Sequence, residues 1–351
     1  MPRILFPGLL LVALSAPALT IETEECAAAV QRTPFLQVEE LSPDARYLAT
    51  GAAWIENPGE LWIKELATGT KRHICKNHSD AINALAFSSG GAMLASGDWR
   101  GMVKVWNSAT GKELASFKAH DRQVWSLAFS PGGTMLASSS PTGIKLWEMA
   151  TGKRRASIAI AGEENGRLGP HAGYCLAFSP DGRTLAYGAD DGVTRLWDVA
   201  TARERARLVG DSGPLLGLAF SPDGQTLATA SRDGTVKLWN VASGHLKSTL
   251  AHKDSLRSVA FSPDGRMLAS CYWSEKYTKN GPDNDRYGTQ IKVWEIATCK
   301  ERVTFCLENV DFYVRPLPMQ FTSEQGLMTI CHDGTVKTWD LRKMADNLKQ
   351  Q

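Results

Sequence analysis

The chain has 351 residues, of which 43% are hydrophobic and 22% charged, and its formal net charge is +2. This composition excludes an intrinsically disordered chain. The near-neutral charge excludes an overall field that would attract nucleic acid or an anionic membrane. We therefore expect no nucleic-acid partner, and local recognition of any other partner.

The first 18 residues follow the order of a secretory signal peptide. Arg3 is the only early charge, an apolar run covers residues 4–14, and small residues fill positions 15–18. This order is typical of export signals, and the run is shorter than the roughly 20 residues that span a bilayer. We predict a signal peptide over residues 1–18, and a periplasmic or secreted protein with no stable membrane insertion. The alternative is an unprocessed apolar tail on a cytoplasmic protein.

A short phrase, Leu-Ala-Phe-Ser-Pro with small variations, recurs along the rest of the chain about every 42 residues. Seven units of this size indicate a solenoid, a propeller or another repeat array. Because such repeats share one continuous core, we predict a single domain over residues 19–345 and a polar tail over 346–351. The clear copies contain Phe87, Phe129, Phe178, Phe220 and Phe261, and weaker relatives lie at Leu41 and Phe321.

The copy between Leu215 and Leu250 shows what one unit folds into. Pro222 and Gly224 form a turn between two apolar segments, because proline fixes the φ of the first corner and glycine takes the left-handed φ. Asp233 then opens a hairpin into a segment of alternating apolar residues. Four short antiparallel strands per repeat predict an all-β fold, a seven-bladed propeller of four-stranded antiparallel blades. The four strands are expected at residues 218–220, 226–230, 235–239 and 246–250.

A Trp-Asp dipeptide ends the third strand of two units, at Trp197-Asp198 and Trp339-Asp340. Together with the recurring turns, it makes the chain resemble the WD-repeat (G-beta-like) β-propeller family over about residues 24–341, as an exported member of bacterial type. Lys64 takes the place of the strand tryptophan in the first unit, as is common for terminal repeats. The other six units carry it, at Trp106, Trp147, Trp197, Trp239, Trp294 and Trp339.

The last unit lacks a fourth strand, because the residues after Asp340 are mostly polar. Counting back from Leu41 by the spacing of the other units places a strand near residues 24–31. The resemblance implies that this N-terminal strand completes the seventh blade and closes the ring, which removes the exposed sheet edges of an open array.

Three connections are longer than their counterparts in the other units. The interval from Phe261 to Trp294 is 33 residues, against 18 or 19 in five other units. The interval from Trp147 to Phe178 is 31 residues and that from Trp294 to Phe321 is 27, against 22 or 23 elsewhere. In a four-stranded antiparallel blade, these connections all lie at the same end of the strands. We call this end of the propeller the insertion face, because insertions in repeat proteins often mark the binding face.

Aromatic and arginine side chains are concentrated where the insertion face is expected, and such residues anchor protein interfaces. The largest insertion covers residues 271–290. The resemblance also implies partner contacts at the residue four positions before each strand phenylalanine and at the residue before each hairpin turn. Aromatic side chains that pin their own loop are the alternative. The candidate binding residues are Trp99, Trp125, Tyr174, Arg232, Arg257, Tyr272, Trp273, Tyr277 and Arg315.

The resemblance implies, in addition, a hydrogen bond in each blade between a loop histidine and a turn aspartate. Three histidines keep the spacing, but Arg100 and Thr142 replace the aspartate in two of these units, and the long insertion follows in the third. Where the aspartate is kept, the loop position holds no histidine. We therefore expect this network to be largely absent. The three histidines are His78, His120 and His252.

The seven cysteines are an odd number, so at least one thiol stays unpaired within the chain. Cys299 and Cys306 lie at opposite ends of an expected strand, roughly 17–20 Å apart, and a disulfide needs Cα atoms within about 7 Å. Cys271 and Cys331 occupy equivalent places in consecutive units, about 10 Å apart. We predict that these four cysteines are free.

Two basic clusters begin expected outer strands. They are Lys153-Arg154-Arg155 and Arg203-Glu204-Arg205. Charged side chains on an edge strand discourage the addition of further strands. We therefore interpret both clusters as protected sheet edges.

The histidines are scattered, one to a loop or turn, and the sequence contains no phosphate-binding loop, metalloprotease helix or nucleophile elbow. We expect no catalytic residues, no metal and no cofactor. The pattern favours a non-catalytic scaffold, monomeric by itself, that binds a protein or peptide through the insertion face. The alternative is a carbohydrate- or metabolite-binding propeller, with or without hydrolytic activity, that uses the mouth of the central channel.

Removal of residues 19–33 tests the closure of the ring. If residues 24–31 complete the seventh blade, the deletion removes a strand and exposes the edge next to it, so the melting temperature falls sharply. Thermal unfolding followed by circular dichroism measures this change, and an unchanged melting curve would contradict the closure.

Overall fold

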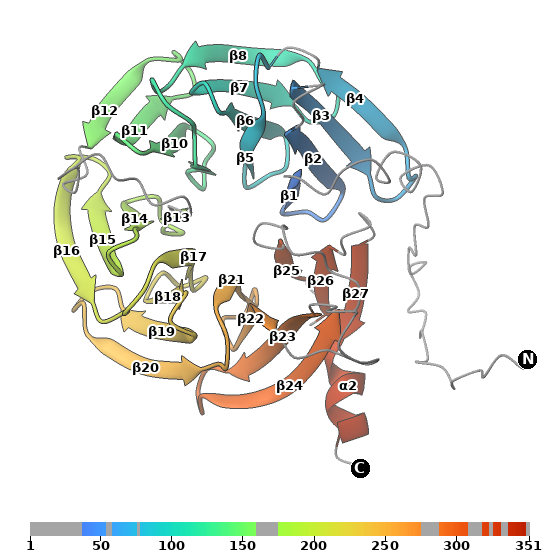
Figure 1. Cartoon of the computed structure of the whole chain (residues 1–351), viewed down its shortest axis with the longest axis vertical. Coiled ribbons are helices and arrows are strands. Elements are labelled where there is room, and N and C mark those ends of the chain that lie inside the picture. The colour runs from blue at the N-terminus through green and yellow to red at the C-terminus, as the bar shows by residue number, and fades with distance from the viewer. Residues whose placement is uncertain are drawn as a thin grey trace, which may run out of the picture.

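The computed structural model describes residues 37–53, 58–75, 78–158, 175–274, 288–307, 318–322, 326–330 and 336–348. These residues form seven antiparallel sheets arranged in a ring, with the first strand of each sheet nearest the central axis and the last on the perimeter (Figure 1). Six sheets have four strands, and the seventh has three among the described residues. The seven-bladed propeller predicted from the repeats is therefore confirmed.

Blade 1 consists of β1 (Gln37–Leu41), β2 (Tyr47–Ala53), β3 (Pro58–Glu65) and β4 (Lys71–Cys75), and blade 2 of β5 (Ile82–Phe87), β6 (Met93–Asp98), β7 (Met102–Asn107) and β8 (Glu113–Lys118). Blade 3 consists of β9 (Ser126–Phe129), β10 (Met135–Ser140), β11 (Gly143–Glu148) and β12 (Arg154–Ile158). Blade 4 consists of β13 (Cys175–Phe178), β14 (Thr184–Gly188), β15 (Val193–Asp198) and β16 (Arg203–Val209).

Blade 5 consists of β17 (Leu215–Phe220), β18 (Thr226–Ser231), β19 (Thr235–Asn240) and β20 (Leu246–Ala251). Blade 6 consists of β21 (Leu256–Phe261), β22 (Met267–Ser274), β23 (Gly288–Glu295) and β24 (Lys300–Leu307). Blade 7 consists of β25 (Met319–Phe321), β26 (Gly326–Ile330) and β27 (Val336–Asp340), and helix α2 (Leu341–Leu348) follows it. In the described part of the chain, no helix has the length and apolar character needed to cross a membrane.

The second and third strands of the blades share one register, which places the repeat tryptophan. In blade 2, Leu94 of β6 lies opposite Trp106 of β7. Blade 6 keeps the same pairing, although the long insertion separates its two strands. In blade 1, Lys64 lies opposite Leu48, so the predicted replacement of the tryptophan in the first unit is confirmed. A slip of one residue would turn the tryptophan to the other side of the sheet, so this register matters for packing.

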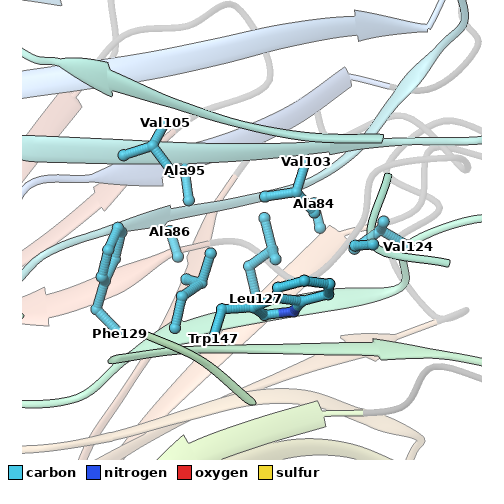
Figure 2. Close-up of a cluster of buried hydrophobic side chains, with 11 residues drawn as sticks. Ala84, Ala86, Ala95, Val103, Val105, Val124, Leu127, Phe129 and Trp147 are labelled. Carbon is cyan, nitrogen blue, oxygen red and sulfur yellow. The ribbon is translucent and has the colours of Figure 1, made fainter. Parts of the chain in front are cut away.

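Adjacent blades pack a surface of small side chains against a surface of large ones. Between blades 2 and 3, Ala86, Ala95 and Val105 contact Phe129 and Trp147 (Figure 2). Alternation along a strand assigns small residues to one side of each blade and large residues to the other. Burial of one large aromatic side chain contributes roughly 3–5 kcal/mol to stability, so these contacts between blades hold the ring together.

Blade 7 packs directly on blade 1 and so brings the two ends of the repeat array together. Met328 and Ile330 of β26 form a buried cluster with Leu41 and Leu48 of blade 1. The Gln320 side chain also donates a hydrogen bond to the carbonyl oxygen of Pro43, with an N···O distance of 2.5 Å. The N-terminal strand expected at residues 24–31, and the signal peptide expected at residues 1–18, lie outside the described residues.

Helix α2 was not predicted from the sequence. Its Leu341 is buried in the cluster between blades 6 and 7, and Met344 packs against the same cluster. The helix therefore lies over the junction of these blades and contacts β24 and β27. It lies in the mostly polar stretch after Asp340, where we expected no fourth strand, and it extends into the tail predicted at residues 346–351.

Two of the four cysteines predicted to be free are confirmed as free thiols, Cys271 and Cys299. Burial raises the pKa of the Cys271 thiol to about 12, so this side chain behaves as a small hydrophobic residue at neutral pH. The side chains of Cys306 and Cys331 lie outside the described part of the structure.

Candidate interaction face

The three enlarged connections begin and end on one face of the ring. They run from β12 to β13, from β22 to β23 and from β24 to β25. Because the strands of each blade are antiparallel and in sequential order, the second-to-third connection and the connection to the next blade share one end of the blade. The strand ends that flank all three connections therefore define the insertion face.

Several candidate residues fall on these connections and lie outside the described residues. They are Tyr174, Tyr277 and Arg315. Trp273 is placed only through its backbone, which pairs with Thr289 between β22 and β23. Their predicted contacts with a partner stay predictions.

In blades 2, 5 and 6, the innermost strand has a β-bulge close to its first residue, at the insertion face. The pairing register shifts between Ile82 and Ala84 in blade 2, and the same shift occurs in blades 5 and 6. A bulge re-aims the side chain of the extra residue. These residues are the ones four positions before the strand phenylalanine, namely Asn83, Leu216 and Arg257.

The side chains at the bulge position have different tasks. Asn83 is buried and donates a hydrogen bond to the carbonyl oxygen of Val124 at 2.6 Å, which joins blade 2 to blade 3. Arg257 of blade 6 is partly buried. Burial lowers its pKa, and the positive charge of Arg232 on blade 5 lowers it further.

The turns between the second and third strands hold two other candidates in equivalent positions. The backbone amide of Trp99 donates to the carbonyl oxygen of Ala81 at 3.0 Å, and that of Arg232 donates to the carbonyl oxygen of Pro214 at 2.8 Å. Trp99 is 44% exposed, and Arg232 is also exposed. Each turn is thus fixed by its backbone while its side chain faces solvent.

The candidates are grouped in two pairs on neighbouring blades. Trp99 on blade 2 and the half-buried Trp125 at the start of blade 3 form one pair, and Arg232 and Arg257 on blades 5 and 6 form the other. Aromatic and arginine side chains are the types that contribute most to binding when a partner covers them.

Tyr272 is buried and supports the fold, which corrects the expectation that it is an exposed contact residue. It is 3% exposed, and its hydroxyl group donates a hydrogen bond to the Gln290 side chain. Its ring packs edge-on against His252, with 5.1 Å between the ring centroids. Tyr272 therefore joins β22 to β23 at the base of the largest insertion.

Among the described residues, the histidine–aspartate bond occurs in blade 2 alone, so the network is largely absent as predicted, although not from this blade. In blade 2, His78 hydrogen-bonds to Ser96 at 2.6 Å and to Asp98 at 3.0 Å, and Trp106 donates to the same Ser96 hydroxyl at 2.9 Å. Asp98 lies two residues before Arg100, the position where we had expected the acid. Its carboxylate also accepts the backbone amides of the turn, so it joins the turn to the histidine.

Two further blades have the histidine, serine and tryptophan of this network. His120 and Trp147 both bond to Ser138, at 2.8 and 2.9 Å. In blade 6, His252 and Trp294 bond to Ser270 in the same way, at 2.7 and 2.9 Å. The serine on the second strand therefore ties the connection between blades to the tryptophan on the third strand. The Nε2 atom of each of these three histidines therefore bonds to the second-strand serine of its blade.

Blade 5 replaces the histidine by an acid and adds a lysine. Asp211 is buried and accepts hydrogen bonds from Thr229 at 3.0 Å and from the Lys237 ammonium at 2.9 Å. Asp233 lies 3.5 Å from the same ammonium group. Trp239 donates a hydrogen bond to Thr229. Hydrogen bonds therefore link Asp211, on the connection between blades, through Thr229 to Trp239 on the third strand.

Gly101 allows the turn between β6 and β7 to lie close to the connection between blades 2 and 3. Gly101 has a φ of +81°, and a Cβ atom on it would lie 2.0 Å from the carbonyl oxygen of His120. The Gly101 carbonyl oxygen accepts the backbone amides of Ala119 and His120. The turn and the connection therefore form one unit that supports Trp99.

Among the described residues, no group of three His, Cys, Asp or Glu side chains is placed to hold a metal ion.

The structure is a ring of antiparallel blades, and in several blades a serine links the tryptophan of the third strand to the connection between blades. These features define a WD-type β-propeller. The family model described as WD domain, G-beta repeat, matches residues 69–107, 111–148, 162–198, 203–240 and 244–279, which is more than half of the chain. The chain belongs to this family. Its propellers commonly act as protein-interaction scaffolds and are typically non-catalytic.

The chain is also similar to the WD repeat-containing protein SL1-17 of Schistosoma mansoni. The two are 28% identical over 127 residues, which is 36% of this chain and 40% of that protein. The match therefore spans less than half the length of the relative. It supports membership of the family and carries no particular partner with it.

A matched pair of serine substitutions on β10 measures the strength of the network. Ser138→Ala removes the hydroxyl that bonds His120 and Trp147, so two buried nitrogen atoms lose their partner. We expect the free energy of unfolding to fall by about 2–3 kcal/mol. Ser139→Ala removes a buried hydroxyl that has no hydrogen bond within the described residues, so it should change the free energy by less than about 1 kcal/mol. Urea unfolding compares them, and equal losses would contradict the role of Ser138.

The buried histidines make stability depend on pH. Burial lowers the pKa of His120 and His252 to about 4, and the positive charges of Lys145 and Lys292 contribute. Between pH 6.5 and 4 the unfolded chain takes up protons that the folded chain does not bind, so the free energy of unfolding falls as the pH falls. Below pH 4 this contribution levels off.

Urea unfolding at a series of pH values between 7 and 4 tests this dependence. The double variant His120→Asn and His252→Asn should show a smaller slope than the wild-type protein over that range, whatever its absolute stability. An identical slope in both proteins would contradict it.

Proposed function

We propose that this propeller is a non-catalytic scaffold that binds a protein or peptide through the insertion face. The observation that carries the proposal is the exposed Trp99 on a turn fixed by hydrogen bonds, at the same end of the blades as the half-buried Trp125 and the exposed Arg232. A large aromatic side chain exposed to solvent loses apolar surface on binding, which stabilises the complex.

The rigidity of this face supports the same proposal. The turns that carry Trp99 and Arg232 are bonded to the connection between blades, and that connection is tied through Ser96 or Thr229 to a buried tryptophan. A contact residue that is ordered before binding loses less conformational entropy on binding. The exposed Arg232 side chain suits an acidic group of the partner, because arginine binds carboxylates through charge-assisted hydrogen bonds.

We also propose that residues 1–18 direct export of the protein, from the order of charge, apolar run and small residues in that segment. N-terminal sequencing of the protein from its native source tests this point. A mature chain that begins at Leu19 would support it, and one that begins at Met1 would contradict it.

A pair of double variants tests the insertion face. Trp99→Ala with Arg232→Ala removes one residue from each group of candidates. Leu246→Ala with Arg183→Ala is the matched control, because it removes an exposed apolar residue and an arginine at the opposite end of the blades. Affinity capture from the native organism, followed by mass spectrometry, should lose at least one protein with the first variant and none with the second.

Equal recovery of all captured proteins by the two variants would show that the insertion face is the wrong surface. A third protein, with Trp125→Ala and Trp273→Ala, extends the comparison to the other candidate tryptophans. Thermal unfolding of each variant confirms that the propeller is folded.

A further inference from the structure

The perimeter of the ring carries a second surface that the insertion face does not include. Strands β12 and β16 are the outermost strands of blades 3 and 4, and among the described residues each pairs on its inner side only. Figure 1 shows them one after the other along the perimeter. An outermost strand presents unpaired backbone N–H and C=O groups that can pair with another extended chain.

Strand β16 presents a row of cationic side chains beside this edge. Arg203, Arg205 and Arg207 are all exposed, while Leu208 is fully buried against the blade. The row ends in Val209, which is 71% exposed. Glu204 is the one acid on the strand, and it forms an ion pair with Arg207.

The charge of these two edges exceeds that of the other outer strands near them. Strands β12 and β16 each have a formal charge of +2, whereas β8 has zero and β20 has +1. Strand β4 of blade 1 also has a formal charge of +2, but β8, the outer strand of the neighbouring blade 2, has no net charge. The positive charge of β4 is therefore not continued on β8. On β12 the arginines, Arg154 and Arg155, are exposed as well. Like charges repel between paired strands and opposite charges attract, so these arginines discourage a second basic edge and favour an acidic one.

We propose that β16 binds an extended acidic segment of a partner protein as a fifth strand of blade 4. Backbone hydrogen bonds to the edge would supply affinity, and carboxylates of the segment would lie next to Arg203, Arg205 and Arg207. The same charges repel a second copy of this edge, so the partner is a different chain. This surface is separate from the insertion face, and the proposal does not depend on the function proposed for that face.

The chemistry of the surface favours an acidic peptide over nucleic acid or a membrane. Neither β12 nor β16 carries an aromatic residue on which a base could stack. Val209 is the one strongly exposed apolar side chain on the two strands, which is little for insertion into a bilayer.

Fluorescence polarisation with the full chain tests the proposal. The probe is a labelled seven-residue peptide of alternating glutamate and valine, and the comparison peptides are the same sequence with lysine for glutamate and an acidic version with N-methylated backbone amides. We expect the acidic peptide to bind and the lysine peptide not to bind. The N-methylated peptide should bind at least tenfold more weakly, because it keeps the charge and loses the hydrogen bonds.

Two sets of substitutions locate the site. The triple variant Arg203→Gln, Arg205→Gln and Arg207→Gln should weaken binding by about 30-fold, since each exposed charge pair contributes roughly threefold. The matched control, with Lys112→Gln, Lys118→Gln and Lys247→Gln on other edges, should change it by less than about twofold. Because Arg205 also bonds to Thr184, a double variant that keeps Arg205 serves if the triple variant is unfolded, and it should weaken binding by about tenfold.

Three results would overturn the proposal. They are equal binding of the N-methylated peptide, equal losses in the triple variant and its control, or tighter binding of a twelve-residue oligothymidine or of phosphatidylserine vesicles than of the acidic peptide. Hydrogen exchange gives an independent reading, because the peptide should slow exchange of the β16 amides and leave those of β20 unchanged.

Discussion

The contact between the large-residue side of one blade and the small-residue side of the next is the interaction on which the whole structure depends. It requires that the tryptophan of the third strand lie opposite the leucine of the second, as Trp106 does with Leu94. If that register is kept in each blade, every blade fits its two neighbours and the ring closes from blade 7 onto blade 1. No blade could bury both of its sides alone.

This constraint concerns the middle of the strands and leaves their ends free to vary. The bulge at the start of the inner strand has the same backbone form in blades 2, 5 and 6, yet its extra residue is Asn83, Leu216 or Arg257. One of these joins two blades, and another is a candidate contact for a partner. The fold therefore permits a change of chemistry on the insertion face without a change of architecture.

The fold could be predicted from the sequence because its signals are local. Turn residues and the spacing from phenylalanine to tryptophan lie within one unit, so they identified seven blades and the exceptional Lys64. Contacts between distant residues could not be predicted in this way. Asp98 reaches His78 only after the turn has folded, and Tyr272 is buried by His252 and Gln290, which lie about 20 residues away on either side. Of the helix α2 side chains that the structure describes, Leu341 and Met344 pack on the core, too few to stand out in a polar segment.

Because of helix α2, the outer edges of the blades also differ in how far they are covered. The helix rests against β24, so the edge of blade 6 is partly covered, whereas the arginine-bearing edge of blade 4 is open two blades away. The open edge faces outward in the plane of the ring, and the insertion face looks along the central axis (Figure 1). One partner bound to the insertion face and another bound to the perimeter would not obstruct each other. The propeller would hold the two partners at about a right angle to each other.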